Sequence, residues 1–270
     1  MNFVSAKPSL PLSPYVKFYW MLETAKPSSE EFVHRIIPNG LLELSFYLGS
    51  KPDPVQKDRV YISQSLISGQ LKRFYDIKYS DSLTVFSIYF YPHGLSMFFD
   101  LPISELLNQT IPLRYLIKDR CERLEDELFG AITFRKRVSV IEQFLLEQLK
   151  KNSVKYNYKR INHCVDIITR HRGVIDIVKL SAEACLSRKQ FERIFSDHIG
   201  MSPKQFLKVV RFQNVINQRS KDPSVSLTKL AYHCGYFYQS HMVRDFRDLS
   251  GLSPKEYFNQ CAPFSDYFQE

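Results

Sequence analysis

The sequence predicts an α+β protein. A β-rich N-terminal domain, a sheet or small barrel with trailing helices, precedes an all-α C-terminal domain of two helix-turn-helix units joined by a long helix. Three observations predict this. Apolar and polar residues alternate within 1–100, the apolar spacing becomes three or four residues near residue 95, and one motif recurs 51 residues apart near the C-terminus.

Composition sets the class of protein. A length of 270 residues favours two domains, and 44% hydrophobic with 24% charged residues is typical of globular proteins. Met1–Pro14 lacks the apolar core of a signal peptide, and no window reaches the length of a membrane span. Five scattered cysteines, none in a C-x-x-C pair, favour reduced thiols. We therefore expect a cytoplasmic protein with no membrane partner.

The net charge of +9 is unevenly distributed. Residues 155–270 carry 18 Lys and Arg against 11 Asp and Glu, whereas the preceding residues carry 19 against 17. The basic excess thus belongs to the part that contains the repeat. It favours a polyanionic partner, although a basic surface without a partner has the same signature.

Strand patterns occupy the first hundred residues. Leu42–Leu48 alternates as a strand with one buried face does, Leu71–Tyr79 alternates more weakly, and Thr84–Tyr91 is apolar on both faces, as in a central strand. Turn-forming residues such as Pro38-Asn39-Gly40 and Pro92-His93-Gly94 separate these segments. A mostly antiparallel sheet follows.

Helical patterns begin after residue 95. We expect Ser104 to cap a helix starting at Glu105, and Asp119–Phe129 to be helical. Arg135–Lys151 carries an apolar stripe that either docks on the sheet or pairs with a second copy, and docking is favoured because the seam is short. The polar segment that follows is the predicted linker. The predicted domains are therefore 1–150, a linker at 151–160, and 161–270.

Capping signals define the two helix-turn-helix units. In the first unit Asp176 caps Ile177–Ala184, Ser187 and Gln190 form a capping box that opens Arg188–His198, and Gly200 ends that helix. Ser202-Pro203 then starts the long helix. In the second unit Ser226 caps the first helix, Phe237–Leu249 is the second, and Gly251-Leu252-Ser253-Pro254 repeats the stop and restart.

The repeat is not uniform. The offset of 51 residues relates Phe195 to Phe246, whereas Leu180 matches Leu230 at an offset of 50, so the second turn is one residue longer. Cys185 stands where the second turn has Gly235, and a cysteine holds a positive φ only at a cost in free energy.

The second helix of each unit has an apolar inner face and a polar outer face. Phe191 and Phe195 share the inner face in the first unit, as do Met242 and Phe246 in the second. Side chains on the outer face and at the helix start can contact base edges and phosphates in the major groove. The candidate DNA-contacting residues are Ser187, Arg188, Lys189, Glu192 and Arg193 in the first unit, and Tyr238, Gln239, Ser240, His241 and Arg244 in the second.

Each candidate also has a structural interpretation. Any solvated helix shows a polar outer face with a few basic residues. Arg193 and Arg244 could pair with Asp197 and Asp248, and Glu192 could be a surface acid beside Arg188. Two equivalent helices in one basic domain nevertheless favour DNA recognition. Their different side chains predict an asymmetric target.

The last hundred residues resemble the AraC/XylS family of bacterial transcription regulators. The resemblance rests on Phe191-Glu192-Arg193-Ile194-Phe195, Gly200-Met201-Ser202-Pro203, Gly235-Tyr236 and Gln239-Ser240-His241-Met242. It implies that one chain places both units in successive major-groove segments and activates or represses transcription beside RNA polymerase. Cys185, Ser181 and Met242 depart from the family pattern, which has glycine, alanine and an aromatic residue there.

The N-terminal part resembles a poorly characterised regulator domain found ahead of such DNA-binding domains. The residues concerned include Leu12-Ser13-Pro14-Tyr15, Ile37-Pro38-Asn39-Gly40 and Phe90-Tyr91-Pro92-His93-Gly94. The resemblance implies a sensory domain that binds a small effector or forms a homodimer. The alternative is a domain that mediates only protein interaction.

Enzymatic chemistry finds little support. Residues 1–154 contain only His34 and His93, too few histidines for a metal cluster, and nucleotide-binding and hydrolase motifs are absent from the sequence. Cys121 could be the acceptor of an alkyl-transfer repair protein, but it lacks activating neighbours. We expect a protein that is not an enzyme and needs no cofactor.

Overall fold

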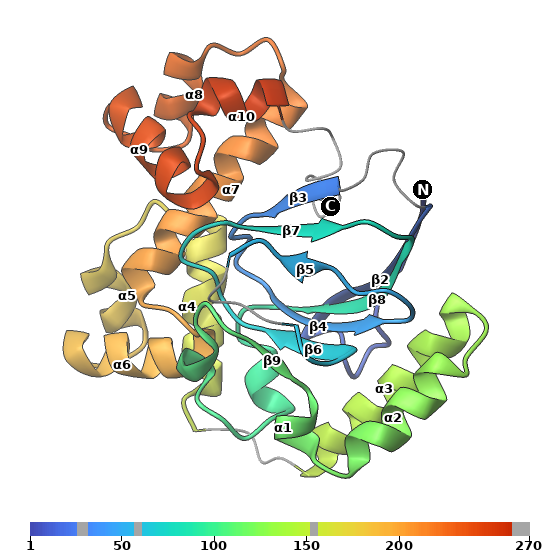
Figure 1. Cartoon of the computed structure of the whole chain (residues 1–270). Helices are drawn as coiled ribbons and strands as arrows, with labels where there is room; N and C mark the ends of the chain where they lie inside the picture. The colour runs from blue at the N-terminus through green and yellow to red at the C-terminus, as the bar shows by residue number, and fades with distance from the viewer. Residues whose placement is uncertain (26–31, 57–60, 152–155, 261–270) are drawn as a thin grey trace.

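The computed structural model describes residues 1–25, 32–56, 61–151 and 156–260 (Figure 1). It contains a β-rich part, from β1 to α3, and a helical part, from α4 to α10. The predicted fold class is confirmed. Among the described residues no helix combines the length and apolarity needed to cross a bilayer.

Two antiparallel sheets form the β-rich part. The six-stranded sheet has the order β1 (Asn2–Ala6), β2 (Val16–Thr24), β8 (Leu83–Phe90), β4 (Leu42–Tyr47), β6 (Ser65–Ser68) and β9 (Thr110–Pro112). The three-stranded sheet has the order β3 (Phe32–Ile36), β7 (Tyr75–Tyr79) and β5 (Asp53–Pro54). The strands expected at 42–48 and 84–91 are confirmed, and the one expected at 71–79 begins only at Tyr75.

The central strands of the six-stranded sheet are buried on both faces. In β4, Leu42, Leu44 and Phe46 pack in the core shared with the trailing helices. Tyr47, on the opposite face, packs with Trp20 and other aromatic residues in the core between the sheets. Strand geometry points successive side chains to opposite faces. This is why β8 is buried along both faces, with only Thr84 half-buried.

Short helices and a helical hairpin follow the sheet. They are η1 (Leu95–Met97), η2 (Ile103–Leu106), α1 (Arg114–Ile117), α2 (Arg120–Phe129) and α3 (Phe134–Lys151). The stripe on α3 docks in the core, where Ile141 and Leu145 are fully buried. The expectation for Ser104 was wrong. This residue lies inside η2, whose N-cap is Pro102, and its hydroxyl donates to Asp197 Oδ1 of the helical part over 3.3 Å.

Seven helices are described in the helical part. They are α4 (Tyr158–Arg170), α5 (Ile177–Glu183), α6 (Arg188–Ile199), α7 (Pro203–Lys221), α8 (Leu227–His233), α9 (Gln239–Ser250) and α10 (Pro254–Gln260). Helix α9 begins two residues later than expected, so Phe237 precedes it. Residues 152–155 of the predicted linker lie outside the described residues, and residues 158–160 already belong to α4.

Candidate DNA-recognition surface

The start of helix α6 is fixed by its sequence. The Ser187 hydroxyl accepts a hydrogen bond from the Gln190 backbone N–H, and Gln190 Oε1 accepts one from the Ser187 backbone N–H. This capping box satisfies two backbone donors that would otherwise lack helical partners. At the other end Gly200 adopts φ +91°, the left-handed conformation that ends a helix. Both predicted caps are confirmed.

The outer face of α6 carries the predicted polar residues. Phe191 and Phe195 are fully buried, whereas Arg188, Lys189 and Arg193 are exposed. Arg188 Nε contacts Glu192 Oε1 at 3.0 Å, as the structural interpretation expected. Arg193 lies 3.9 Å from Asp197, but its side chain is 71% exposed. An ion pair as exposed as this one contributes little to stability. The Arg193 guanidinium is accessible to a partner.

Helix α9 begins differently. Its N-cap residue is Tyr238, whose side chain makes no capping hydrogen bond, although the equivalent residue in the first unit is Ser187. Tyr238 is 57% exposed and the preceding Phe237 is 77% exposed. The rings of Phe237 and His241 both lie edge-on to Tyr238, at centroid distances of 5.2 and 5.5 Å. An exposed aromatic cluster therefore stands at the start of this helix.

The remaining candidates on α9 are largely accessible. Ser240, His241 and Arg244 are exposed, whereas Met242 and Phe246 are fully buried on the inner face. Within the described chain Arg244 takes part in no ion pair. The neighbour considered for it, Asp248, instead binds Lys208 Nζ at 2.6 Å. Gln239 is half-buried, and its Oε1 accepts a hydrogen bond from the Thr228 hydroxyl.

Helix α7 holds α6 and α9, which we call the recognition helices because they carry the candidate DNA-contacting residues. Phe206 packs on Phe195 of α6 and Phe212 packs on Phe246 of α9, with ring centroids 5.8 and 4.8 Å apart. Lys208 and Arg211 of α7 also reach Asp245 of α9, at 3.4 and 3.5 Å. The long helix thus fixes the two recognition helices relative to each other, as the sequence predicted.

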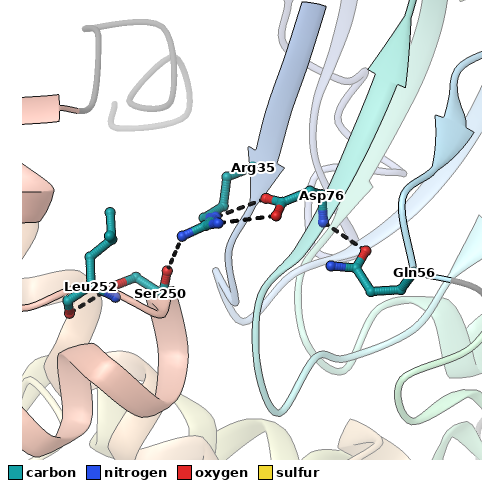
Figure 2. Close-up of polar contacts among 5 residues, drawn as sticks. All are labelled: Arg35, Gln56, Asp76, Ser250 and Leu252. Atoms are coloured by element: carbon teal, nitrogen blue, oxygen red, sulfur yellow. Dashed lines mark hydrogen bonds and ion pairs between the residues drawn. The ribbon is translucent and has the colours of Figure 1, made fainter.

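The β-rich part contacts the C-terminal ends of both recognition helices. At α9, Arg35 Nη1 donates to the Ser250 carbonyl over 3.0 Å while the same guanidinium binds Asp76 through two hydrogen bonds (Figure 2). Arg35 also lies 4.1 Å from the Phe74 ring centroid. Because a guanidinium presents several donors in one plane, a single residue can join the two parts.

The end of α6 meets the β-rich part in an equivalent way. A Cβ added at Gly200 would lie 3.0 Å from the Ile103 side chain, and one at Gly251 would lie 2.5 Å from Phe74. These two glycines are the repeat-equivalent C-caps. The opposite, N-terminal ends of α6 and α9 are exposed and carry the candidate residues.

Comparisons with known proteins agree with this geometry. A helix-turn-helix domain model matches residues 180–260, and a domain of unknown function (DUF6597) matches residues 4–112. Residues 180–260 are an AraC-type helix-turn-helix domain. The AraC-type domain therefore includes α6, α7 and α9, with all ten candidate residues.

The curated relatives that match part of this chain are transcriptional regulators. An uncharacterised HTH-type transcriptional regulator of Haemophilus influenzae is 33% identical over 120 residues, covering 44% of this chain and 38% of the relative. The HTH-type transcriptional regulator GbdR of Pseudomonas aeruginosa is 27% identical over 132 residues, or 44% of this chain and 35% of the relative. These matches span less than two fifths of the relatives' length.

A solved structure of ToxT from Vibrio cholerae, in its apo K231A form, aligns with a TM-score of 0.49 and 10% identity. The alignment covers 90% of this chain and 98% of that chain.

Sequence reasoning missed two features of the site. Phe237 was expected inside the helix, although the offset of 51 places it opposite Leu186, before the helix start. Arg35 was not considered, because nothing local links it to Ser250, 215 residues away. Cys185 was correctly singled out: it adopts φ +52°, whereas Gly235 has φ +79°.

The surroundings of Cys121 do not favour alkyl transfer, and those of His93 do not favour metal binding. Burial and the neighbouring Glu125 raise the pKa of the Cys121 thiol to about 12, which disfavours the nucleophilic thiolate. His93 is buried, and its Nε2 lies 3.1 Å from the Pro14 carbonyl, a structural contact. Among the described residues no three His, Cys, Asp or Glu side chains are grouped so that they could hold a metal ion.

Proposed function

We propose that this protein is a sequence-specific, DNA-binding transcription regulator. Helices α6 and α9 each enter a major groove, with Lys189, Glu192 and Arg193 in one and Gln239, His241 and Arg244 in the other. The observation that carries the proposal is the pair of equivalent helices, each ended by a left-handed glycine, whose polar faces and N-terminal ends are exposed on one basic domain. Because the two sets of side chains differ, the two half-sites differ in sequence.

Selection of duplexes from a random pool by the full chain tests this proposal. We expect an asymmetric motif of two short elements about one helical turn, roughly 10 bp, apart. Binding that depends on salt but not on sequence would refute it.

Arg244→Ala tests one base contact. We expect it to weaken the selected site by about 1–3 kcal/mol and to relax the preference at one base position. Arg123→Ala on α2, another exposed arginine but outside the surface, is the matched control. An equal loss on every sequence would mark Arg244 as a phosphate contact instead.

We further propose that a small effector acts through the β-rich part and that the protein works in the cytoplasm beside RNA polymerase. The contacts of the β-rich part with the ends of α6 and α9 support effector control, since they give it a physical route to the recognition helices. The alternative is that the β-rich part only mediates protein interaction or homodimer formation. Stabilisation of the chain by a metabolite favours the effector, whereas concentration-dependent dimerisation without such stabilisation favours the alternative.

A further inference from the structure

A cleft separates the two parts of the molecule beside the Arg35 contact. Its volume is about 850 Å³, within the range of small-molecule sites. One wall comes from β2, β3 and the Pro38-Asn39-Gly40 turn, and the other from α4 and α7. A molecule bound there would touch both parts at once.

Lys17 enters this cleft from an irregular strand. The register between β2 and β8 shifts between Val16 and Phe18, so Lys17 occupies a β-bulge. Bulges redirect a side chain and are frequent beside binding sites. Lys17 is half-buried, and loss of solvent lowers the pKa of its ammonium group. Among the described residues no carboxylate forms an ion pair with it. Its Nζ lies 5.8 Å from the Phe18 ring centroid, a cation–π contact that offsets only part of the cost of desolvation. An anionic ligand would offset the rest.

The facing helix offers hydrogen-bond donors. Four amide residues of α7 line the cleft: Gln213, Asn214, Asn217 and Gln218. Gln213 Nε2 donates to the Pro38 carbonyl over 2.7 Å and so ties this wall to the turn. Asn214 Nδ2 is buried and, within the described residues, has no hydrogen-bond partner. An amide donor of this kind suits an oxygen acceptor.

The charge balance of the lining is strongly positive. Its ionisable residues are Lys17, Arg35, Arg170, Arg172 and Lys221 on the cationic side, Asp166 on the acidic side, and His34 and His93. Burial lowers the pKa of both histidines, so they add no charge at neutral pH. Arg35 is already paired with Asp76. Arg170, Arg172 and Lys221 are exposed to solvent, whereas Lys17 is half-buried. Lys17 is therefore the cation best placed to bind a ligand inside the cleft.

Much of the remaining lining is apolar. Ile36, Leu41, Tyr91, Phe206 and Val210 belong to it. Inorganic anions gain nothing from such walls, whereas an organic anion buries its apolar body there.

We propose that the cleft binds a small organic oxyanion with an apolar body, whose charged group is held by Lys17 and by amide donors of α7. This inference rests on the proposed effector control and assigns its site and ligand class. Because the ligand contacts both walls, it stabilises the arrangement in which the β-rich part holds the ends of α6 and α9.

Binding of defined probes to the full chain without DNA tests the proposal. The probes are benzoate, decanoate and phenyl phosphate, each compared with its neutral counterpart (benzamide, decanamide and phenol), and inorganic phosphate. Thermal shift and calorimetry measure the binding. We expect at least one organic anion to bind saturably, and to bind at least tenfold more tightly than its neutral counterpart and than inorganic phosphate. Comparing the carboxylates with the phosphate ester identifies the head group.

Variants then locate the site. Lys17→Met removes the charge but keeps the length of the side chain, and should weaken the binding probe at least tenfold. Asn214→Asp places a carboxylate in the opposite wall and should weaken it as well. Lys136→Met, at an exposed lysine of α3, is the matched control and should leave binding unchanged.

Several results would overturn the proposal. They are binding by none of the organic anions, equal binding of the neutral counterparts, or unchanged binding by Lys17→Met. Circular dichroism confirms that each variant is folded. Selection of a DNA motif by the same preparation without any probe is an independent measurement, so failure of the ligand site and failure of DNA recognition can be told apart.

Discussion

At the scale of single residues, the two recognition helices differ most at their first position. Ser187 caps α6 through its side chain, whereas Tyr238 caps α9 without a side-chain hydrogen bond and exposes its ring. A missing cap costs about 1 kcal/mol, and exposed rings gain nothing from folding. The second unit thus carries features that stability alone does not favour, which indicates a binding role for Phe237 and Tyr238. Thymine methyl groups are suitable apolar partners in the major groove.

Tyr238→Ser separates these two effects. The new hydroxyl can cap α9, so the free energy of unfolding should rise by about 0.5–2 kcal/mol, while affinity for the selected DNA site falls. Urea denaturation and gel-shift titration measure the two quantities. Phe237→Ser is the control, because it removes an exposed ring before the helix and adds no cap. It should weaken DNA binding without raising stability. Unchanged DNA binding by both variants would contradict a role for the cluster.

A half-buried acid in the β-rich part predicts a pH dependence of stability. Glu43 lies on β4 among aromatic residues, and burial raises the pKa of its carboxyl to about 7, although the hydroxyls of Ser87 and Ser45 offset part of the effect. The folded state therefore holds a proton that the unfolded state releases near pH 4.5. Stability from this group is greatest below that pH and falls as the pH rises to about 7.

Glu43→Gln should remove this dependence. At pH 8 the variant should be more stable than the natural chain by up to about 3 kcal/mol, and near pH 4.5 the difference should vanish. Denaturant unfolding across this range measures the difference. Glu122→Gln, at an exposed acid of α2, is the control and should give no pH-dependent gain. A difference that is constant with pH would show that Glu43 does not titrate in this range.

At the scale of elements, the two turns solve the same geometric problem with different residues. Cys185 holds φ +52° and Gly235 holds φ +79°. A side chain in the left-handed region costs about 1–2 kcal/mol, a penalty that glycine avoids. Moreover, a Cβ at Gly235 would lie 2.3 Å from Val174, so the second turn also needs glycine for space. The first turn stores a strain that the second does not.

Cys185→Gly should release that strain. We expect the free energy of unfolding to rise by about 1 kcal/mol, and the urea concentration at the midpoint of unfolding to rise with it. Cys185→Ala removes the thiol but keeps the Cβ, so it should give no gain. Gly235→Ala should destabilise the protein. Equal stabilities of the glycine and alanine variants at position 185 would argue against strain.

Elements whose determinants are local could be predicted from the sequence. The capping boxes, the left-handed glycines and the apolar stripe of α3 are encoded within a few neighbouring residues, and the structure contains each of them. Ser104 looked like a helix cap by the same local rules, but its hydroxyl binds Asp197, 93 residues away. Local patterns cannot weigh such a distant partner. The β-bulge at Lys17 depends on pairing with β8 and was likewise invisible in the sequence.

At the scale of the whole molecule, the arrangement of the two parts is the feature that the sequence predicts least well. The recognition helices and their outer residues follow from the repeat, whereas the contacts that hold their C-terminal ends come from segments far away in the chain. In Figure 1, β3 and β7 extend toward the second helix-turn-helix unit (α8 and α9), and the helical part covers one side of the sheets. The β-rich part therefore contacts the ends of α6 and α9 directly, and the proposed effector control depends on these contacts.

Arg35→Met tests this connection at α9. The variant keeps a long side chain against Phe74 but loses the charge-assisted hydrogen bond to the Ser250 carbonyl, a contact of about 1.5–3 kcal/mol. Because that bond anchors the end of α9, amide hydrogen exchange near residues 247–252 should accelerate at least tenfold. The end of α6, which η2 contacts independently, should exchange at its original rate and serves as an internal control. Arg123→Met, at an exposed arginine of α2, should leave both ends unchanged. Acceleration throughout the helical part would indicate general destabilisation, and unchanged exchange at α9 would show that Arg35 does not hold the two parts together.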